Sequence, residues 1–170
     1  MLARLAVLAG IFAYISGLTG CCGYRTGTSL APNVTSIHVS SFNNRTGDPD
    51  VETVATSATV REFQKDGSLR MSSTDEADAI IEATVTGLTL EPLRYSKDSA
   101  TETTEFRLLL TANVIVKDRK TGKTISTHQD LTGKTTFVPG GDLSSAKRLA
   151  IPAAARDLAH VIVAAVVEAW

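Results

Sequence analysis

Alternating apolar and polar positions are the clearest pattern in this chain. Between residues 106 and 116 every second residue is apolar, which indicates a β-strand with one buried face. Residues 79–85 show the same period of two. After Gly87 the apolar phase shifts to Leu88 and Leu90, and a phase shift beside a glycine favours a β-bulge. The pattern therefore predicts two long strands, one of them bulged.

Further strands are predicted on either side of these two. Ile37 and Val39 give residues 34–42 the strand period, and Leu69 to Ser72 is a candidate for a short extra strand. Residues 118–123 have the composition of a hairpin turn, so residues 125–137 are expected to return beside the strand at 106–116. The segment from Pro92 to Thr104 is polar and is expected to connect two strands.

Two helices are predicted. Asp48 and Pro49 resemble an N-cap and a first helical residue, and Gly67 supplies a left-handed stop after Asp66. In the second helix Asp142 is the expected cap, and Pro152 should either kink the helix or begin a new one. The apolar positions recur at helical spacing: Val51, Val54, Ala55 and Ala58 in the first helix, and Ala154, Leu158, Val161, Ile162 and Ala165 in the second.

The predicted order is β-α-β-β-β-α. Long alternating strands need one face covered, and two amphipathic helices can cover it. We therefore expect an α+β two-layer sandwich, with a mostly antiparallel or mixed sheet of about four strands and two helices on one face. Residues 33–170 are expected to form one domain.

Composition excludes several classes of protein. Lys and Arg number 17 against 18 Asp and Glu, so the chain lacks the basic excess of a nucleic-acid binder. Aromatic residues make up 5%, too few for a platform that stacks bases. The two cysteines, Cys21 and Cys22, are adjacent, which argues against a disulfide framework and against a zinc site. We expect no metal and no cofactor.

The first 20 residues have the pattern of an export signal. Arg4 precedes an apolar stretch from Leu5 to Leu18, which is too short for a span of about 20 residues, although an N-terminal membrane anchor is the alternative. Residues 18–21, Leu-Thr-Gly-Cys, resemble the bacterial lipobox, which implies cleavage before Cys21 and acyl chains on that residue. Several acyl chains make anchoring stable. Residues 21–32 then read as a lipidated tether, and the absence of Asp after Cys21 points to the outer membrane.

No catalytic motif is present. The chain has no Gly-x-Ser-x-Gly, His-Glu-x-x-His, P-loop or Gly-x-Gly-x-x-Gly sequence. His38, His128 and His160 are expected to be surface or packing residues. The acidic cluster of Asp75, Glu76 and Asp78 is a candidate cation site, but a solvated turn is the favoured interpretation, because no oxygen-rich loop surrounds it.

Several segments resemble lipopolysaccharide-assembly lipoproteins of the LptE type. Residues 22–25, Cys-Gly-Tyr-Arg, are similar to the family's first mature residues, with one extra cysteine, so the lipidated residue is Cys21 or the alignment shifts by one. Residues 37–46 resemble the family's first strand and its Phe-x-Asn-x-Thr segment. Residues 77–81 resemble its Ala-Asp-aliphatic strand entry, and residues 104–116 its long strand led by an aromatic residue.

The resemblance implies a non-enzymatic outer-membrane lipoprotein on the periplasmic face. It implies a domain that plugs and helps to assemble a β-barrel translocon, LptD-like, that delivers lipopolysaccharide to the surface. Two alternatives remain: another outer-membrane accessory lipoprotein, such as a secretion or transporter auxiliary, and, less favoured, a periplasmic hydrolase.

A glycolipid contact requires cations for phosphate groups near the ends of loops. The candidates for lipopolysaccharide binding are Arg94, Lys97, Lys134 and Lys147. Ordinary solvated side chains are the alternative, and Asp98 and Glu102 would weaken a positive field around the first two residues.

Overall fold

The computed structural model describes residues 34–95 and 103–167, so the predicted signal, the tether and Lys97 lie outside the described residues. It contains six strands and two helices. In chain order they are β1 (Ser36–Val39), β2 (Asn43–Asn44), α2 (Val51–Asp66), β3 (Arg70–Met71), β4 (Ala79–Tyr95), β5 (Thr103–Asp118), β6 (Thr124–Phe137) and α3 (Leu143–Val167).

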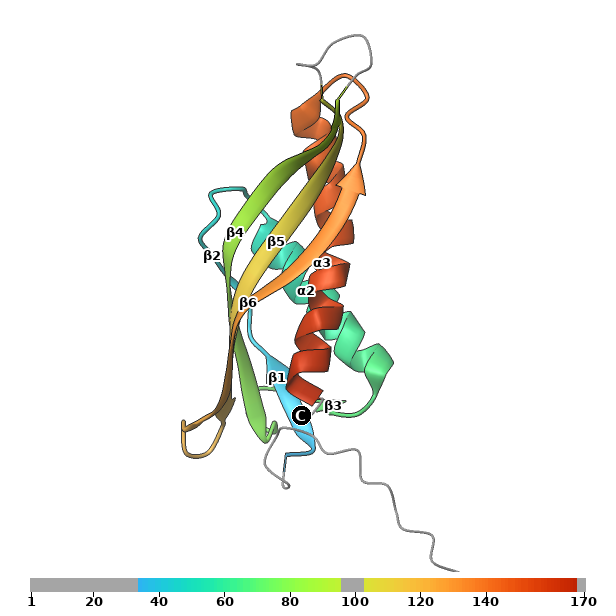
Figure 1. The fold of residues 1–170 in the computed structure, drawn as a ribbon. Helices are drawn as coiled ribbons and strands as arrows, with labels where there is room; N and C mark the ends of the chain where they lie inside the picture. Colours follow the sequence, from blue (N-terminus) through green and yellow to red (C-terminus); the bar gives the residue numbers. More distant parts are fainter. Residues whose placement is uncertain (1–33, 96–102, 168–170) are drawn as a thin grey trace, which may run out of the picture.

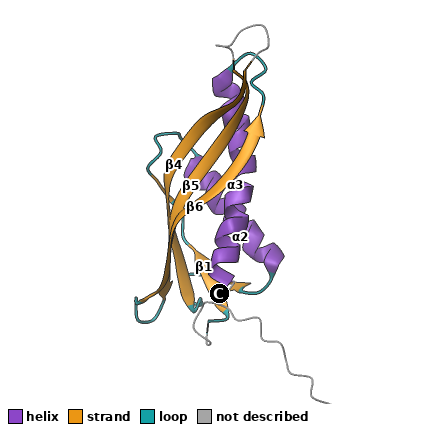
Figure 2. Ribbon diagram, viewed as in Figure 1, coloured by secondary structure: helices purple, strands orange, loops and turns teal. Residues whose placement is uncertain are grey.

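The strands form one mixed, open sheet with the order β3-β1-β4-β5-β6, and β2 pairs with β4 beside this path. The three long strands β4, β5 and β6 are antiparallel neighbours, whereas β1 runs parallel to β3 and β4. Both helices lie on the same side of the sheet (Figures 1 and 2). The predicted α+β sandwich with helices on one face is confirmed. The expected four strands become six: the candidate short strand at Leu69 to Ser72 is present as β3, and β2, at two residues, is too short to show a period.

The core lies between the sheet and the helices. The even-numbered residues of β5 from Leu108 to Val116 are all fully buried, and β5 lies between β4 and β6. The odd-numbered residues of β4 from Ala79 to Val85 face the same core. Helix α3 packs against this layer through Leu158, Ile162 and neighbouring residues. The period of two in the sequence thus identified the buried face of the central strands.

The irregular points of the sheet also follow the sequence. The register of β4 against β5 shifts between Val85 and Gly87, which confirms the predicted bulge. The turn between β5 and β6 occupies the predicted residues 119–123. There the Asp118 carboxylate accepts hydrogen bonds from the amide and hydroxyl of Thr121 at 2.7 and 2.8 Å, which lower the pKa of Asp118.

The predicted connection from Pro92 to Thr104 is wrong at both ends. Strand β4 continues to Tyr95, and β5 already begins at Thr103. Arg94, one of the polar residues that suggested a loop, lies on the open face of the sheet, where it stands opposite Glu105. Pro92 is tolerated because β4 has a neighbour on one side only at that level.

The first helix begins later than predicted. Helix α2 starts at Val51, and its N-cap position is Asp50, in the left-handed region with φ 65° and without a side-chain capping bond. Asp48 is therefore not the cap; its carboxylate contacts Lys147 instead. The predicted stop is confirmed, since Gly67 has φ 73° and its amide bonds to the Phe63 carbonyl. The predicted strand at 34–42 is likewise shorter, and Asn43–Asn44, just beyond its predicted end, pair with β4.

Helix α3 is continuous from Leu143 to Val167, so no second helix begins at Pro152. Asp142 caps it as predicted, accepting bonds from the Ser144 and Ser145 amides at 3.1 and 2.9 Å. The buried stripe of α3 is wider than expected. Val161 and Ala165, which were predicted to belong to it, lie beside it and are only half-buried. The helix is long and apolar enough to span a membrane, with a mean hydropathy of 1.6 over its most apolar stretch. Half of that stretch is buried inside the domain, as in a core helix.

Helix α3 approaches β6 unusually closely. A Cβ atom added at Gly133 would lie 2.2 Å from the Leu158 amide nitrogen and 2.5 Å from the Ala154 carbonyl oxygen. The backbone of α3 between Ala154 and Leu158 can therefore lie this close to β6 only because residue 133 has no side chain. Beside it, the Lys134 amide donates to the Asp157 carboxylate at 2.9 Å, which ties the edge strand to the helix.

Candidate functional site

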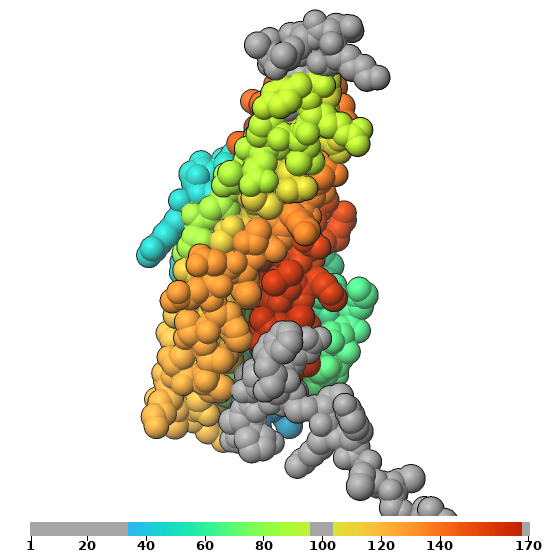
Figure 3. Space-filling view, viewed as in Figure 1, coloured from blue at the N-terminus to red at the C-terminus, as the bar shows by residue number. Residues whose placement is uncertain are grey.

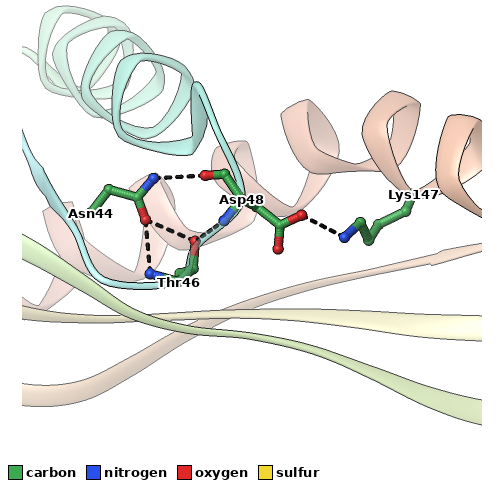
Figure 4. A network of polar contacts seen from close by, with 4 residues as sticks. All are labelled: Asn44, Thr46, Asp48 and Lys147. Carbon is green, nitrogen blue, oxygen red and sulfur yellow. Dashed lines mark hydrogen bonds and ion pairs between the residues drawn. The ribbon is translucent and has the colours of Figure 1, made fainter.

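Two of the sequence motifs hold the sheet together. Phe42 is buried, and the Asn44 side chain links the chain on both sides: its Oδ1 accepts from the amide and hydroxyl of Thr46, and its Nδ2 donates to the Asp48 carbonyl at 2.7 Å. Lys147 of α3 then reaches the Asp48 carboxylate, 2.5 Å away (Figure 4). The Asn44 Nδ2 atom also donates to Glu52 of α2 at 2.7 Å, so the Phe-x-Asn-x-Thr segment and the adjoining Asp48 connect the sheet to both helices.

The Ala-Asp segment at the start of β4, residues 77–81, makes a second set of long-range contacts. The Asp78 Oδ2 atom accepts four hydrogen bonds, from the amides and hydroxyls of Thr35 and Ser36, at 2.8–3.1 Å. These bonds, that of the Thr35 amide foremost, lower the pKa of Asp78 to about 2. The predicted solvated turn describes Asp75 and Glu76, which are exposed. It is wrong for Asp78, because strand β1 supplies donors far away in sequence.

Of the four basic residues predicted to bind glycolipid, the three that the structure describes do not form one cluster. Arg94, 79% exposed at the end of β4, lies 3.1 Å from Glu105. Lys134 is exposed on β6, opposite Leu109 and so roughly 13 Å farther along the strand. Lys147 is in the helix layer, paired with Asp48. Lys97 lies outside the described residues. The structure leaves binding by these residues untested and shows that two of them already have carboxylate partners.

The histidines contact nearby polar groups. His38 lies 3.2 Å from the Ser72 carbonyl and 3.1 Å from the Thr74 hydroxyl, His128 lies 3.2 Å from the Ser126 hydroxyl, and His160 lies 3.4 Å from Glu62. Within residues 34–95 and 103–167, no group of three His, Cys, Asp or Glu side chains is placed to hold a metal ion.

The end of the molecule where β6 ends and α3 begins is apolar. Tyr95, Val138, Leu143 and Leu149 are the large hydrophobic residues that are exposed in the described part of the chain, and Leu149 reaches 82%. A hollow of about 540 Å³ lies between the end of β6 and the start of α3, lined by residues that include Phe137, Val138 and Leu149. Alternation predicted the buried faces but gave no signal for this surface, which depends on how far α3 extends beyond α2.

A second hollow, of about 380 Å³, separates the starts of the two helices. Its lining mixes Asp48, Asp50, Lys147 and Arg148 with apolar residues such as Val54 and Ile151. Figure 3 shows the whole molecule as an elongated body whose front is formed largely by β6 and α3. In this second hollow Lys147 is paired with Asp48, and in the first the Asp142 carboxylate accepts from the Ser145 amide at 2.9 Å.

Comparison with solved structures places the fold. The chain is similar to a Xanthomonas campestris protein of the DUF330 family, with 10% identity over 79% of this chain and 86% of that one and a TM-score of 0.50. It is also similar to PelC of Paraburkholderia phytofirmans, crystallised as a dodecamer (18%, 85% and 96%, 0.49), and to lipoprotein B of Nitrosomonas europaea (14%, 82% and 83%, 0.47). At 10% identity, the similarity to the Xanthomonas campestris protein shows the fold alone. The other two similarities, with TM-scores of 0.49 and 0.47, carry no further argument. No curated protein matches the sequence.

The fold thus defines an α+β domain whose open mixed sheet carries two helices on one face. The family model described as lipopolysaccharide-assembly, LptE, matches residues 34–166, nearly all of that domain. The chain belongs to the LptE family of lipopolysaccharide-assembly proteins.

Proposed function

We propose that this protein is a non-enzymatic outer-membrane lipoprotein, held on the periplasmic face through lipid on Cys21, that plugs and helps to assemble an LptD-like β-barrel translocon for lipopolysaccharide. The observation that carries the proposal is the match to the LptE family over residues 34–166. The lipobox at residues 18–21 supports the anchor, since it immediately precedes the tether to this domain.

The dimensions of the sheet support a plug. Strands β4, β5 and β6 contain 17, 16 and 14 residues. At about 3.3 Å per residue these strands extend about 45–55 Å, more than the hydrocarbon core of a bilayer, which is about 30 Å thick. The elongated shape in Figure 1 is therefore long enough to occupy a barrel through most of its height.

The described side chains also suit a binding role. The acidic groups with lowered pKa values, Asp78, Asp118 and Asp142, each accept hydrogen bonds at a different strand or helix end. A hydrolase needs a nucleophile within reach of a base. The groups that shape this fold are used to position segments, which is what a partner-binding domain requires.

Affinity purification in mild detergent tests the proposal. The full chain, tagged at its C-terminus and expressed at native level in its own host, is expected to bring down one large outer-membrane barrel. Recovery of a secretin or a transporter without such a barrel would contradict the proposal and favour another accessory role. The Cys21→Ala chain is the control for the anchor. Because it lacks the acyl chains that should hold the protein at the membrane, it is expected to recover no barrel from detergent-solubilised membranes, whereas the acylated chain is expected to recover it.

A further inference from the structure

Strand β6 forms one edge of the sheet, and it pairs only with β5 in the described part of the chain. The Lys134 amide donates to the Asp157 carboxylate of α3, so this amide points away from β5. Along an antiparallel strand, the residues whose backbone groups face away from the neighbour recur at every second position. The pairing with β5 is unbroken from Thr132 to Phe137. The amide and the carbonyl of Thr136 therefore also point outward.

This edge is closed at Lys134 and open at Thr136. Asp157 accepts from the outward amide of Lys134, whereas no strand or side chain within residues 34–95 and 103–167 accepts a hydrogen bond from the outward amide of Thr136. An open edge is a template for pairing with another extended chain, and proteins usually block it. The open stretch, residues 135–138, borders the hollow of about 540 Å³ beside the start of α3 (Figure 1).

The other side of this hollow is the first half of α3, whose side chains there are apolar and mostly small. Ala146, Ala150 and Ala153 lie about one helical turn apart, so they share one face of the helix. Their methyl groups leave room for a second backbone beside β6. Leu149 and Val138 line the same hollow and are 82% and 68% exposed. The hollow is thus a groove with a strand edge on one side and an apolar helix face on the other, and we call it the β6–α3 groove.

The two sides of the β6–α3 groove together select an extended peptide. Another backbone presents amides and carbonyls at the period of the strand edge, and its alternate side chains can enter the apolar side. A lipid acyl chain would cover Leu149 but would leave the Thr136 amide without a partner. Water would bond to that amide but would leave Leu149 and Val138 exposed.

We infer that the β6–α3 groove binds an extended segment of a partner protein, which adds a strand to the edge of β6 and places apolar side chains, at alternate positions, against α3. The open stretch of edge extends about 13 Å at about 3.3 Å per residue, which is enough for a segment of about four residues. Such a partner segment is additional to the barrel of the proposed function and does not depend on it.

Peptide selection followed by a charge substitution tests the inference. Random short peptides displayed on phage are selected against the acylated full chain in lipid nanodiscs, and the most enriched peptide is labelled and titrated by fluorescence anisotropy. Its apolar residues are expected at alternate positions, and Leu149→Asp should weaken its affinity about tenfold. The matched control, Ser57→Asp, adds the same charge to an exposed position of α2 and should leave the affinity unchanged. Enriched peptides without alternation, or equal affinities for the two variants, overturn the inference.

A second pair of variants tests the backbone contact. Thr136→Pro removes the outward amide at an edge position, where proline is tolerated, and Thr136→Val keeps that amide. The proline variant should bind the selected peptide about tenfold more weakly than the valine variant, which should match the unmodified chain. Equal binding by the two variants would mean apolar contact alone, as a lipid acyl chain would make, and overturns the inference.

Peptides methylated on alternate amides decide the case if thermal unfolding shows that a variant is not folded, because they need only the unmodified chain. Methylation of the amides that face β6 should weaken binding about tenfold, whereas methylation of the other amides should leave it unchanged. Equal effects of the two methylation patterns overturn the inference. Recovery of the barrel is a separate readout that tests the proposed function alone.

Discussion

At the scale of single residues, Asp78 organises the edge of the sheet. Its carboxylate accepts four hydrogen bonds from Thr35 and Ser36, which fixes where the chain enters β1 beside β4. The acidic composition of residues 75–78 did not predict this role, because the donors lie more than 40 residues away.

Replacing Asp78 with Asn should cost about 2 kcal/mol of unfolding free energy, because two backbone amides lose a charged acceptor. The folded pKa of Asp78, about 2, is below its ordinary 3.8. This stability is therefore fully present above pH 3.8 and is lost as the pH falls toward 2. Chemical denaturation at several pH values should show a constant difference between the variant and the unmodified chain near neutrality and a shrinking difference below about pH 4. A difference that persists unchanged at acidic pH would exclude the charged acceptor as its cause.

The glycolipid contact stays a prediction at this scale. Arg94→Ala with Lys97→Ala should weaken binding to purified lipopolysaccharide at low salt, where attraction is least screened. The matched control, Arg61→Ala with Lys65→Ala, removes the same charge from exposed positions of α2 and should leave affinity unchanged. Equal affinities for the two double variants would assign the binding to overall charge or to other residues. Lys147 is a poorer candidate for such a test, since its removal leaves Asp48 unpaired.

At the scale of elements, β5 supports the core with one face and the open surface with the other. Leu110→Asp should destabilise the domain by roughly 3–5 kcal/mol, because it buries a carboxylate without a partner. Leu109→Asp is the control: it lies next in sequence on the open face, is only half-buried, and should cost about 1 kcal/mol. Similar losses in chemical denaturation for the two variants would show that the two faces are wrongly assigned.

The contact between β6 and α3 depends on one missing side chain. Gly133→Ala would place Cβ against helix backbone, which cannot rotate away, so α3 must shift from the sheet. The expected cost is roughly 1–3 kcal/mol. Gly87→Ala is the control, since its Cβ would meet Thr111 at an ordinary 3.9 Å. A melting temperature that is lowered equally by both substitutions would mean that general strand effects, rather than the helix contact, determine the loss.

The elements differ in how far the sequence predicts them. Period two over residues 106–116 gave the buried face of β5, and the phase shift at Gly87 gave the bulge, because both are local. The start of α2 and the ends of β4 and β5 were wrong, since Asp48 bonds to α3 and Arg94 and Tyr95 pair with residues of β5. The dispersed positions of Arg94, Lys134 and Lys147 are likewise set by long-range packing. Charge and spacing alone could not place them.

At the scale of the whole molecule, the lipid anchor on Cys21 stays a prediction. Cys21→Ala should abolish incorporation of a palmitate analogue in metabolic labelling, whereas Cys22→Ala should retain it, because the lipobox ends at Cys21. The opposite outcome, labelling that survives in Cys21→Ala and disappears in Cys22→Ala, would move the lipidation site by one residue.

The central claim is that the sheet and helices of this LptE-family chain occupy the interior of an outer-membrane barrel. Cryo-electron microscopy of the complex purified through the tagged full chain tests it most directly. The proposed function predicts one copy of the chain inside one barrel. A density for this domain outside any barrel, on a secretin or a transporter, would contradict the claim.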